Sequence, residues 1–349
     1  MLRVGIAGIG FMGWIHYLAY KNVAGIELGA VSSRDPKKLS GDWRGIQGNF
    51  GPPGEQVDLS AVSKYSDFEQ MLADPSIDLV DICLPPDKHC EATLQALSAG
   101  KHVFVEKPMA LTANECQSMV AAAEKAGKQV LVGHVLPFFA EYVYAREAVA
   151  SGKYGRLIGG SFKRVISDPL WLKDFYDPNK VGGPLVDLHV HDAHFIRMLF
   201  GQPTSVVSQG RMRGDVVEYC NTFFQFADPS LVVSASGGVV NQQGRPFTHG
   251  FELHLEKATL NYELAWVAGE SSPRMLPLTV FDSEGKAIVP ELPASGPIQP
   301  FEAEIAEVVR SIESGRPSDI LGGALACDAV VLCHRQTDSV RQGKAVRVS

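Results

Sequence analysis

Three groups of residues in this sequence have types and spacing that could support chemistry. The first is a turn containing Gly8, Gly10 and Gly13, which follows an apolar run at residues 2–7. Gly8 permits a tight turn, Gly10 lets the backbone approach a pyrophosphate without an intervening Cβ, and Gly13 lets the next helix pack close to its strand. The first amides of that helix have no partner inside it, so they can face phosphates. The spacing therefore predicts a bound dinucleotide.

The second group lies at the end of the next apolar run. Ser33 falls 20 residues after Gly13, where an NAD enzyme usually has an acidic residue for the ribose 2'-hydroxyl. A carboxylate would repel a 2'-phosphate, whereas Ser33 can donate a hydrogen bond and Arg34 can pair with the phosphate or stack on adenine. These two residues favour NADP over NAD. Alternatively, Asp35 is the acid that binds the ribose, or it is the N-cap of a helix that starts at Pro36.

The third group begins with Lys107, which follows an expected strand at residues 102–105. An ammonium group at the carboxyl edge of a parallel sheet, where ligands bind, can hydrogen-bond a substrate oxygen and stabilise its developing negative charge. Alternatively, Lys107 is a solvated surface residue, as most lysines are.

The same group continues in residues 182–197, with the sequence GlyGlyProLeuValAspLeuHisValHisAspAlaHisPheIleArg. In a helix, Asp187, His191 and His194 share one face. Asp187 can then orient or tune the imidazole of His191, and histidine suits proton exchange near neutral pH. We expect His191 to act as the general base in alcohol oxidation and the general acid in carbonyl reduction.

The density of His189, His191, Asp192 and His194 also allows a metal site, because a HisXHis pair is typical of zinc or iron ligation. In a helix, however, the side chains of His189 and His191 point about 200° apart, which prevents chelation. In a strand both would return to one face. Pro184 and the glycines before it indicate the start of a helix, so we expect no metal, with His189 and Asp192 capping or lining the cleft.

The first third of the chain alternates apolar runs with helical patterns, which predicts an α/β Rossmann domain with a doubly wound parallel sheet over residues 1–125. Thr112 is a good N-cap, and Gly127 is a stop signal for the helix between them. Residues 41–53 are interpreted as a loop insertion. The expected strands are residues 2–7, 27–32, 78–84, 102–105 and 129–132, and the expected helices are residues 11–21, 67–72, 88–99 and 113–126.

Beyond about residue 150, a series of apolar runs has few helical patterns between them. They predict a second, α+β domain over residues 126–349, with a large, open, mostly antiparallel sheet. Two late helices are expected at residues 299–314 and 323–342, and the last could pack back across the first domain. The expected strands begin at residues 156, 205, 220, 231 and 259.

Composition excludes several classes of protein. The net charge of -7 and the lack of a Lys/Arg run argue against nucleic-acid binding. No apolar run is long enough for a membrane span, and no leader precedes Leu2, so we expect a cytoplasmic protein that does not bind membranes. The six cysteines have no zinc-type spacing and are expected to be free thiols.

Several motifs in combination are more specific than any of them alone. After the glycine turn comes an apolar run, residues 78–84, that ends in Pro85 with His89 shortly after, and a GlyLysHisVal strand then leads into GluLysPro at residues 106–108. Together they resemble the Gfo/Idh/MocA oxidoreductase family, and the resemblance extends along essentially the whole chain.

This resemblance implies roles for particular residues. Lys107 would lie beside the nicotinamide and the substrate, and Glu106 would help to hold the nicotinamide half of the cofactor. Asp187 and His191 match an Asp and a His that the family places four residues apart. Relatives often form homodimers or homotetramers, so the resemblance implies a similar assembly.

The sequence also departs from the family pattern. Many relatives carry an arginine at or near Pro137, and relatives commonly have Asp where His194 stands. His134 could fill the vacated polar role, or it is a histidine at a strand end. Trp171 belongs to an aromatic and polar loop, residues 168–180, that suits a sugar-like ligand or ordinary packing.

We therefore expect an NAD(P)-dependent dehydrogenase or reductase that acts on a CH–OH group of a sugar, polyol or related polyhydroxy compound. The alternatives are an NAD-dependent glycoside hydrolase of the same superfamily, a non-catalytic cofactor-binding regulator, and a metal-dependent hydrolase. The expected catalytic residues are Lys107, Asp187 and His191. The expected cofactor contacts are Gly8, Gly10, Phe11, Met12, Gly13, Ser33, Arg34, Leu84, Pro85, His89, Glu106 and Lys107. The expected substrate contacts are Lys107, His134, Trp171, His191 and His194.

Overall fold

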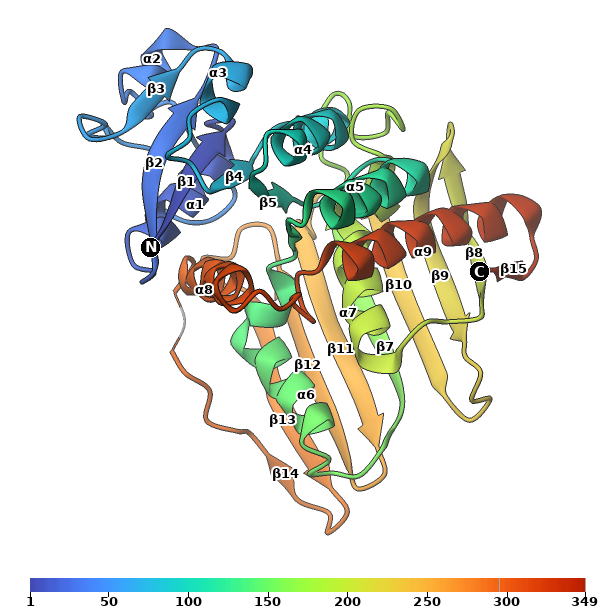
Figure 1. Ribbon diagram of the computed structural model, residues 1–349. Coiled ribbons are helices and arrows are strands. Elements are labelled where there is room, and N and C mark those ends of the chain that lie inside the picture. Colours follow the sequence, from blue (N-terminus) through green and yellow to red (C-terminus); the bar gives the residue numbers. More distant parts are fainter. Residues whose placement is uncertain (295, 349) are drawn as a thin grey trace. The chain divides into compact units, whose positions relative to one another are not determined.

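The computed structural model describes residues 1–294 and 296–348 (Figure 1). The chain divides into two compact units. Unit 1 contains Met1–Phe138 and Ala294–Cys327, and unit 2 contains Phe139–Pro293 and Asp328–Ser349. Within the described residues, no helix has both the length and the apolar character needed to cross a membrane.

Unit 1 is built on a six-stranded parallel sheet in the order β3-β2-β1-β4-β5-β6. The order reverses between β1 and β4, which is the arrangement of a doubly wound nucleotide-binding sheet. The expected Rossmann fold is therefore confirmed. The strands are β1 Leu2–Ala7, β2 Ile26–Ser32, β3 Ser63–Tyr65, β4 Leu79–Ile82, β5 His102–Glu106 and β6 Val130–Gly133.

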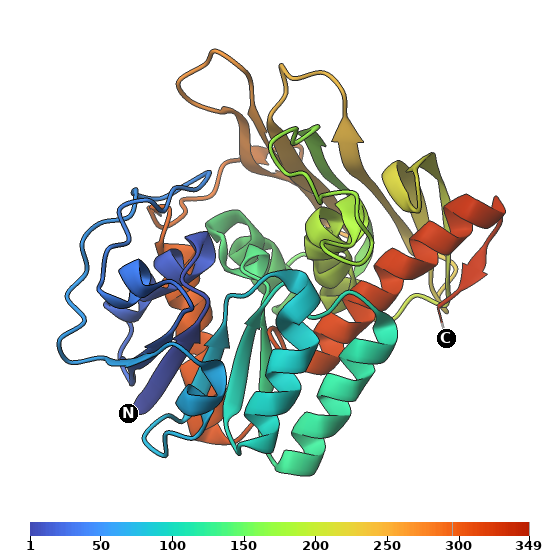
Figure 2. The same ribbon diagram turned by 90° about the horizontal axis from the view of Figure 1, so that it is seen from above.

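Helices cover both faces of this sheet (Figure 2). From β1 the chain crosses to β2 on one side of the sheet's centre, and from β4 it crosses to β5 on the other side. Because such crossovers are right-handed, α1 lies on one face of the sheet and α4 and α5 lie on the other. The Thr112 hydroxyl accepts the Glu115 amide at the start of α5, and the Glu115 carboxylate accepts the Thr112 amide. Gly127 ends the helix at φ 62°. Both expected helix boundaries are confirmed. The helices are α1 Phe11–Tyr20, α2 Pro36–Leu39, α3 Phe68–Leu72, α4 His89–Ser98, α5 Ala113–Ala126 and α8 Gln299–Ser314, with 3-10 turns at Pro86–Lys88 and Leu136–Phe138.

A late segment of the chain returns to unit 1. Phe301 and Ile305 of α8 belong to the same buried core as Trp14 and Ile15 of α1. The amide of Val132 in β6 donates to the Leu321 carbonyl at 2.8 Å. Unit 1 is therefore discontinuous in sequence, and its sheet continues past the expected boundary at residue 125 because β6 pairs with β5.

Unit 2 contains a nine-stranded mixed sheet in the order β14-β13-β12-β11-β7-β10-β9-β8-β15. Only the β7–β10 pair is parallel among the described strand pairs, so the sheet is mostly antiparallel, as expected. The strands are β7 Leu157–Ser167, β8 Ser205–Arg213, β9 Val216–Gln225, β10 Val232–Val240, β11 Phe247–Leu255, β12 Ala258–Trp266, β13 Arg274–Asp282, β14 Ala287–Ile288 and β15 Val346–Arg347.

The helices of unit 2 are α6 Ala140–Ala150, a π-helical turn at Leu185–His189, and α7 Val190–Phe200, together with the part of α9 (Gly323–Gln342) from Asp328 onward. Three polar contacts fix this part of α9 within unit 2. Cys333 donates to the Leu185 carbonyl, the Thr222 hydroxyl donates to Gln336, and the Ser208 amide donates to the Ser339 hydroxyl. All six cysteines are present as thiols, as expected.

Candidate cofactor and catalytic residues

The glycine turn has the geometry that a dinucleotide requires. Gly8 has φ +97°, and a Cβ there would lie 2.6 Å from the Cys83 carbonyl oxygen. A Cβ on Gly13 would overlap the Gly8 carbonyl oxygen, so α1 can pack this closely only with glycine at that position. A Cβ on Gly10, in contrast, would have no neighbour within 4 Å. Space therefore lies next to the backbone where a pyrophosphate would approach it.

The start of α1 suits an anion. Gly10 is the N-cap, and within the described structure no side chain caps the helix and no acidic residue lies in its first turn. The Lys38 ammonium donates to the Ile9 carbonyl, which adds a positive charge beside the turn. These observations fit the pyrophosphate of a dinucleotide.

The residues after β2 form a small capped turn. The Asp35 carboxylate accepts a bond from the Lys37 amide at 2.9 Å, so Asp35 is the N-cap of α2, one of the two alternatives considered for it. The Ser33 hydroxyl accepts the Asp35 amide at 3.2 Å, which leaves its own proton able to donate. Arg34 is exposed.

The ends of β4 and β5 are tied together by a histidine. The two ring nitrogens of His89 lie 2.7 Å from the Pro108 carbonyl and 2.8 Å from the Leu84 carbonyl. Burial lowers the pKa of His89, although both carbonyls act in the opposite direction. His89 thus holds the loop that contains Leu84 and Pro85 against the turn that follows β5.

That turn carries the expected pair Glu106 and Lys107. The Glu106 side chain is buried, and its Oε2 accepts the Lys107 amide at 3.0 Å. Lys107 is half-buried, and the Lys107–Pro108 peptide bond is cis. The structure therefore brings the ends of β1, β4 and β5 together at one edge of the sheet, where the expected cofactor contacts gather.

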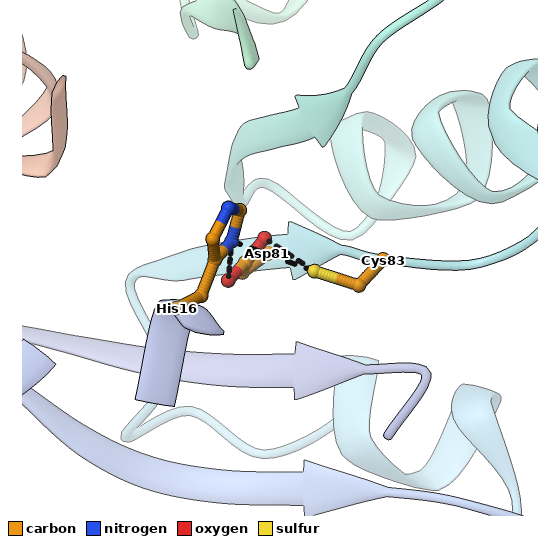
Figure 3. Close-up of side chains that lie close together, drawn as sticks. All are labelled: His16, Asp81 and Cys83. Carbon is orange, nitrogen blue, oxygen red and sulfur yellow. Dashed lines mark hydrogen bonds and ion pairs between the residues drawn. The ribbon is translucent and has the colours of Figure 1, made fainter. Parts of the chain in front are cut away.

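A polar cluster that no sequence motif predicted lies near these strand ends (Figure 3). His16 of α1 is fully buried, and its Nδ1 lies 2.9 Å from Asp81 Oδ2 and 3.4 Å from Cys83 Sγ. The Tyr20 hydroxyl also donates to Asp81 at 2.9 Å. The other ring nitrogen of His16 lies 3.0 Å from Glu106 Oε1. The available signal was a histidine and an aspartate inside otherwise apolar runs, a pattern that is unusual in a core.

Electrostatics separate the members of this cluster. Burial alone would lower the pKa of His16, but Asp81 and Cys83 outweigh it, and the pKa is raised well above its usual value. Burial and then Asp81 raise the pKa of the Cys83 thiol. The raised pKa of His16 favours a protonated ring beside Asp81, and the raised pKa of Cys83 favours its neutral thiol.

The same residues are the only described group of three potential metal ligands close enough to share an ion. Hydrogen bonds account for the 2.9 Å distance from His16 Nδ1 to Asp81 Oδ2 and the 3.4 Å distances from Cys83 Sγ to His16 and Asp81. Asp81 also accepts a hydrogen bond from the Tyr20 hydroxyl. We assign no ion to this cluster.

In unit 2, residues 185–189 form a π-helical turn rather than the regular helix that the sequence predicted. Asp187 lies in this turn, and His191 lies in the first turn of α7. Both are partly buried, whereas His194 is fully buried. The expected common face of Asp187, His191 and His194 stays a prediction.

His189 and Asp192 are both completely buried, so in this structure they are core residues and do not line a cleft. Arg164 pairs with Asp192 through two contacts of 2.7 and 3.3 Å, and His189 Nδ1 lies 3.5 Å from the same carboxylate. A Cβ on Gly237 would lie 2.6 Å from His189 Nδ1, so a strand passes close to this ring. The Arg164–Asp192 ion pair therefore connects the start of α7 to strand β7.

The expected substrate contacts are in different environments. His134, after β6 in unit 1, is completely buried. Trp171, in the loop of unit 2, is 68% exposed. Their roles as substrate contacts stay predictions.

Two family models match the chain. The model described as "Oxidoreductase family, NAD-binding Rossmann fold" matches residues 2–134, and the "GFO/IDH/MocA C-terminal domain" matches residues 142–261. Together they account for most of the sequence.

Individual proteins give more distant similarities. A 1-carboxy-3-chloro-3,4-dihydroxycyclohexa-1,5-diene dehydrogenase of Comamonas testosteroni is 30% identical over 57% of this chain, and the match spans only 47% of that relative. A 1,5-anhydro-D-fructose reductase of Ensifer adhaerens is 29% identical over 72% of this chain and 74% of its own. A structure of levoglucosan dehydrogenase in complex with NADH has a TM-score of 0.80 at 21% identity, covering 100% of this chain and 99% of that one. This last likeness shows a common fold.

Proposed function

Because the chain belongs to the Gfo/Idh/MocA family of NAD(P)-binding oxidoreductases, we propose that it transfers hydride between NAD(P) and a carbinol or carbonyl carbon of a sugar, polyol or related polyhydroxy compound. The observation that carries the proposal is the open space next to Gly10 at the sheet edge where β5 delivers Lys107. The name of the 1,5-anhydro-D-fructose reductase supports a carbohydrate-like substrate.

The proposed chemistry uses three side chains. When bound, NAD(P) supplies the hydride acceptor or donor. Lys107 polarises the substrate oxygen, His191 exchanges the hydroxyl proton, and Asp187 orients the imidazole. In the oxidative direction the hydroxyl proton moves to His191 as the carbon loses its hydride, so charge does not accumulate on the oxygen.

The proposed cofactor is NADP in preference to NAD. The Ser33 hydroxyl has a proton to donate, and the exposed Arg34 guanidinium is able to pair with a 2'-phosphate. Asp35, the nearest carboxylate in sequence, is engaged as a helix cap. An Arg34→Ala variant should weaken NADPH binding more than NADH binding, and equal weakening of both would contradict the preference.

We also propose that copies of this chain associate as homodimers or homotetramers. Exposed apolar side chains on β9 and β13 support an apolar contact surface on unit 2, including Phe223, Met275 and Leu276. Light scattering after gel filtration measures the assembly, and a monomer at micromolar concentration would contradict this proposal.

The function is tested by a screen of sugars and polyols, including myo-inositol, levoglucosan and 1,5-anhydro-D-fructose, with NAD(H) and NADP(H) in parallel. We expect a substrate-dependent change in nicotinamide absorbance. Release of a free sugar from a glycoside without net cofactor change would instead indicate a hydrolase. Tight cofactor binding without turnover of any compound would indicate a regulator.

A further inference from the structure

The cluster around His16 contains buried charges that the proposed chemistry does not use. We propose that His16 is a positioning residue, whose ring links Asp81 of β4 to Glu106 of β5 and thereby fixes the turn that carries Lys107. This inference rests on the proposed function only for its catalytic consequence. The structural link itself can be measured without a substrate.

The first step is the connection between elements. His16 lies on α1, and its ring stacks on Phe104 of β5 with centroids 5.2 Å apart and an interplanar angle of 18°. Its two nitrogens approach carboxylates on two neighbouring strands, Asp81 at 2.9 Å and Glu106 at 3.0 Å. One rigid ring therefore spans the helix and both strands whose ends form the sheet edge.

The second step is the connection to Lys107. The Glu106 carboxylate uses Oε1 toward His16 and Oε2 to accept the Lys107 amide at 3.0 Å. Gly133 on the neighbouring strand β6 leaves little space, because a Cβ there would lie 3.1 Å from Glu106 Oε1. Movement of Glu106 would therefore displace the Lys107 backbone.

The third step is charge. A protonated histidine carries an N–H on both ring nitrogens. Nδ1 is hydrogen-bonded to Asp81, whereas Nε2 lies at ion-pair distance from Glu106 without the alignment of a hydrogen bond. The other ionisable groups that face it are Tyr20 on its own helix, Cys83 beyond β4, and Glu304 on α8. Burial, then Glu106, raises the pKa of Glu304 well above its usual value, so Glu304 remains a neutral acid and does not compete for the ring.

The protonated ring therefore lies close to two buried carboxylates, Asp81 and Glu106. Removing it leaves a buried carboxylate without its partner, which is more costly than the loss of a surface ion pair. The structural consequence should be greatest at Glu106, because the Tyr20 hydroxyl still donates to Asp81.

The test compares three variants by the exchange rate of the Lys107 amide in 15N-lysine-labelled protein, with the resonance assigned from a K107R sample. Asparagine reaches the position of Nδ1 and glutamine that of Nε2, so His16→Asn keeps a donor for Asp81 and His16→Gln keeps an N–H group beside Glu106. Both remove the charge. Tyr20→Phe is the matched control, since it removes another donor to Asp81 from the same helix.

We expect Lys107 amide exchange to rise about tenfold in H16N and to change by less than about twofold in H16Q and Y20F. Turnover of the compound among myo-inositol, levoglucosan and 1,5-anhydro-D-fructose that reacts fastest should fall in H16N through kcat rather than KM, and H16Q should restore part of it. Equal amide exchange in folded H16N and wild-type protein would overturn the inference. Stoichiometric, chelator-removable zinc in wild-type protein that is absent from H16N protein would also overturn the inference.

If H16N does not fold, Glu106→Gln tests the same link from the other side. It should increase Lys107 amide exchange and move the His16 ring titration, followed by NMR, to lower pH, and an unchanged titration would overturn the link. If none of the three compounds reacts, the proposed function fails for that set, while the amide measurement still decides the role of His16.

Discussion

At the scale of single residues, the glycine turn places two different demands on its positions. Gly13 is required for packing, since a side chain would overlap the Gly8 carbonyl, whereas Gly10 faces open space. We attribute the need for glycine at position 10, but not at position 13, to a bound ligand. The two positions therefore separate cofactor binding from folding within one turn.

A Gly10→Ala variant should fold normally and bind NADPH at least about tenfold more weakly, because its methyl group occupies the approach of the pyrophosphate. Gly13→Ala should instead lower the free energy of unfolding by about 1–3 kcal/mol, because α1 must move away from its strand. Fluorescence titration and urea unfolding measure the two effects. Unchanged NADPH affinity in G10A would contradict this position for the pyrophosphate.

The proposed catalytic residues make a different prediction. Lys107→Met and His191→Asn should each lower kcat by about 10² or more, because each removes a group that acts on the substrate oxygen or its proton. NADPH affinity should remain nearly the same in both. Lys125→Met, at an exposed position on α5, is the control and should retain full activity. Full turnover in K107M or H191N would remove that residue from the mechanism.

At the scale of elements, sequence patterns predicted five of the six strands of the first sheet and the caps of α5. These strands are apolar runs between glycine, proline and polar residues, and each pattern reflects burial. β3 was not predicted because Ser63–Tyr65 is only three residues long and contains no aliphatic residue. The π-turn was missed because its altered period extends over only five residues.

Among the expected site residues, too, those with a local sequence pattern were predictable and those that depend on distant contacts were not. The glycine turn was predictable because Gly8 and Gly13 have local backbone reasons and Gly10 leaves space for a ligand. Lys107 was identified from its place at a strand end, and Glu106 through the family resemblance. The burial of His189 and Asp192 depends on Arg164 from a distant strand, so local spacing gave no indication of it. His16 lies between strands that are distant in sequence, and no local pattern joins it to Glu106.

The Arg164–Asp192 pair should stabilise the start of α7. Asp192→Asn would leave the buried Arg164 guanidinium without a charged partner and should lower the free energy of unfolding by about 3–5 kcal/mol. Chemical denaturation of the variant measures the loss. A change below about 1 kcal/mol, typical of exposed pairs, would contradict this role.

The buried carboxyl group of Glu304 on α8 should lower the stability of the protein near neutral pH, whereas the Arg164–Asp192 pair raises it. The folded protein keeps the Glu304 proton above the pH at which the unfolded chain loses it, because burial raises the pKa in the folded state. Stability therefore falls as pH rises from the usual glutamate pKa toward the raised one, by about 1.4 kcal/mol for each pH unit in that window. Glu304→Gln removes this cost, so it should stabilise the protein at neutral pH and have little effect at pH values below the usual glutamate pKa.

Unfolding measured across this pH range tests the prediction. Glu313→Gln is the control, since Glu313 is exposed on the same helix and should show no such pH-dependent gain. If E304Q is no more stable than wild-type protein at neutral pH, Glu304 is not a buried neutral acid.

At the scale of the whole molecule, the chain combines a Rossmann unit with a unit built on a large mixed sheet. Of the residues with proposed roles, the glycine turn and Lys107 belong to the first unit, and Asp187 and His191 belong to the second. The family and fold follow from motifs spread along the chain, whereas the substrate depends on loop side chains that vary within one fold. Hydride transfer to or from the nicotinamide is therefore the property that most needs a direct test.

The most direct test follows the hydrogen that moves. NADP+ or NAD+ is incubated with the enzyme and with C-deuterated myo-inositol or C-deuterated sugars, and the reduced cofactor is analysed by mass spectrometry. We expect one deuterium to be transferred from the oxidised carbon to the nicotinamide, and this transfer to be lost in K107M. Oxidation of a labelled compound without deuterium in the cofactor, or no transfer from any of them, would contradict it.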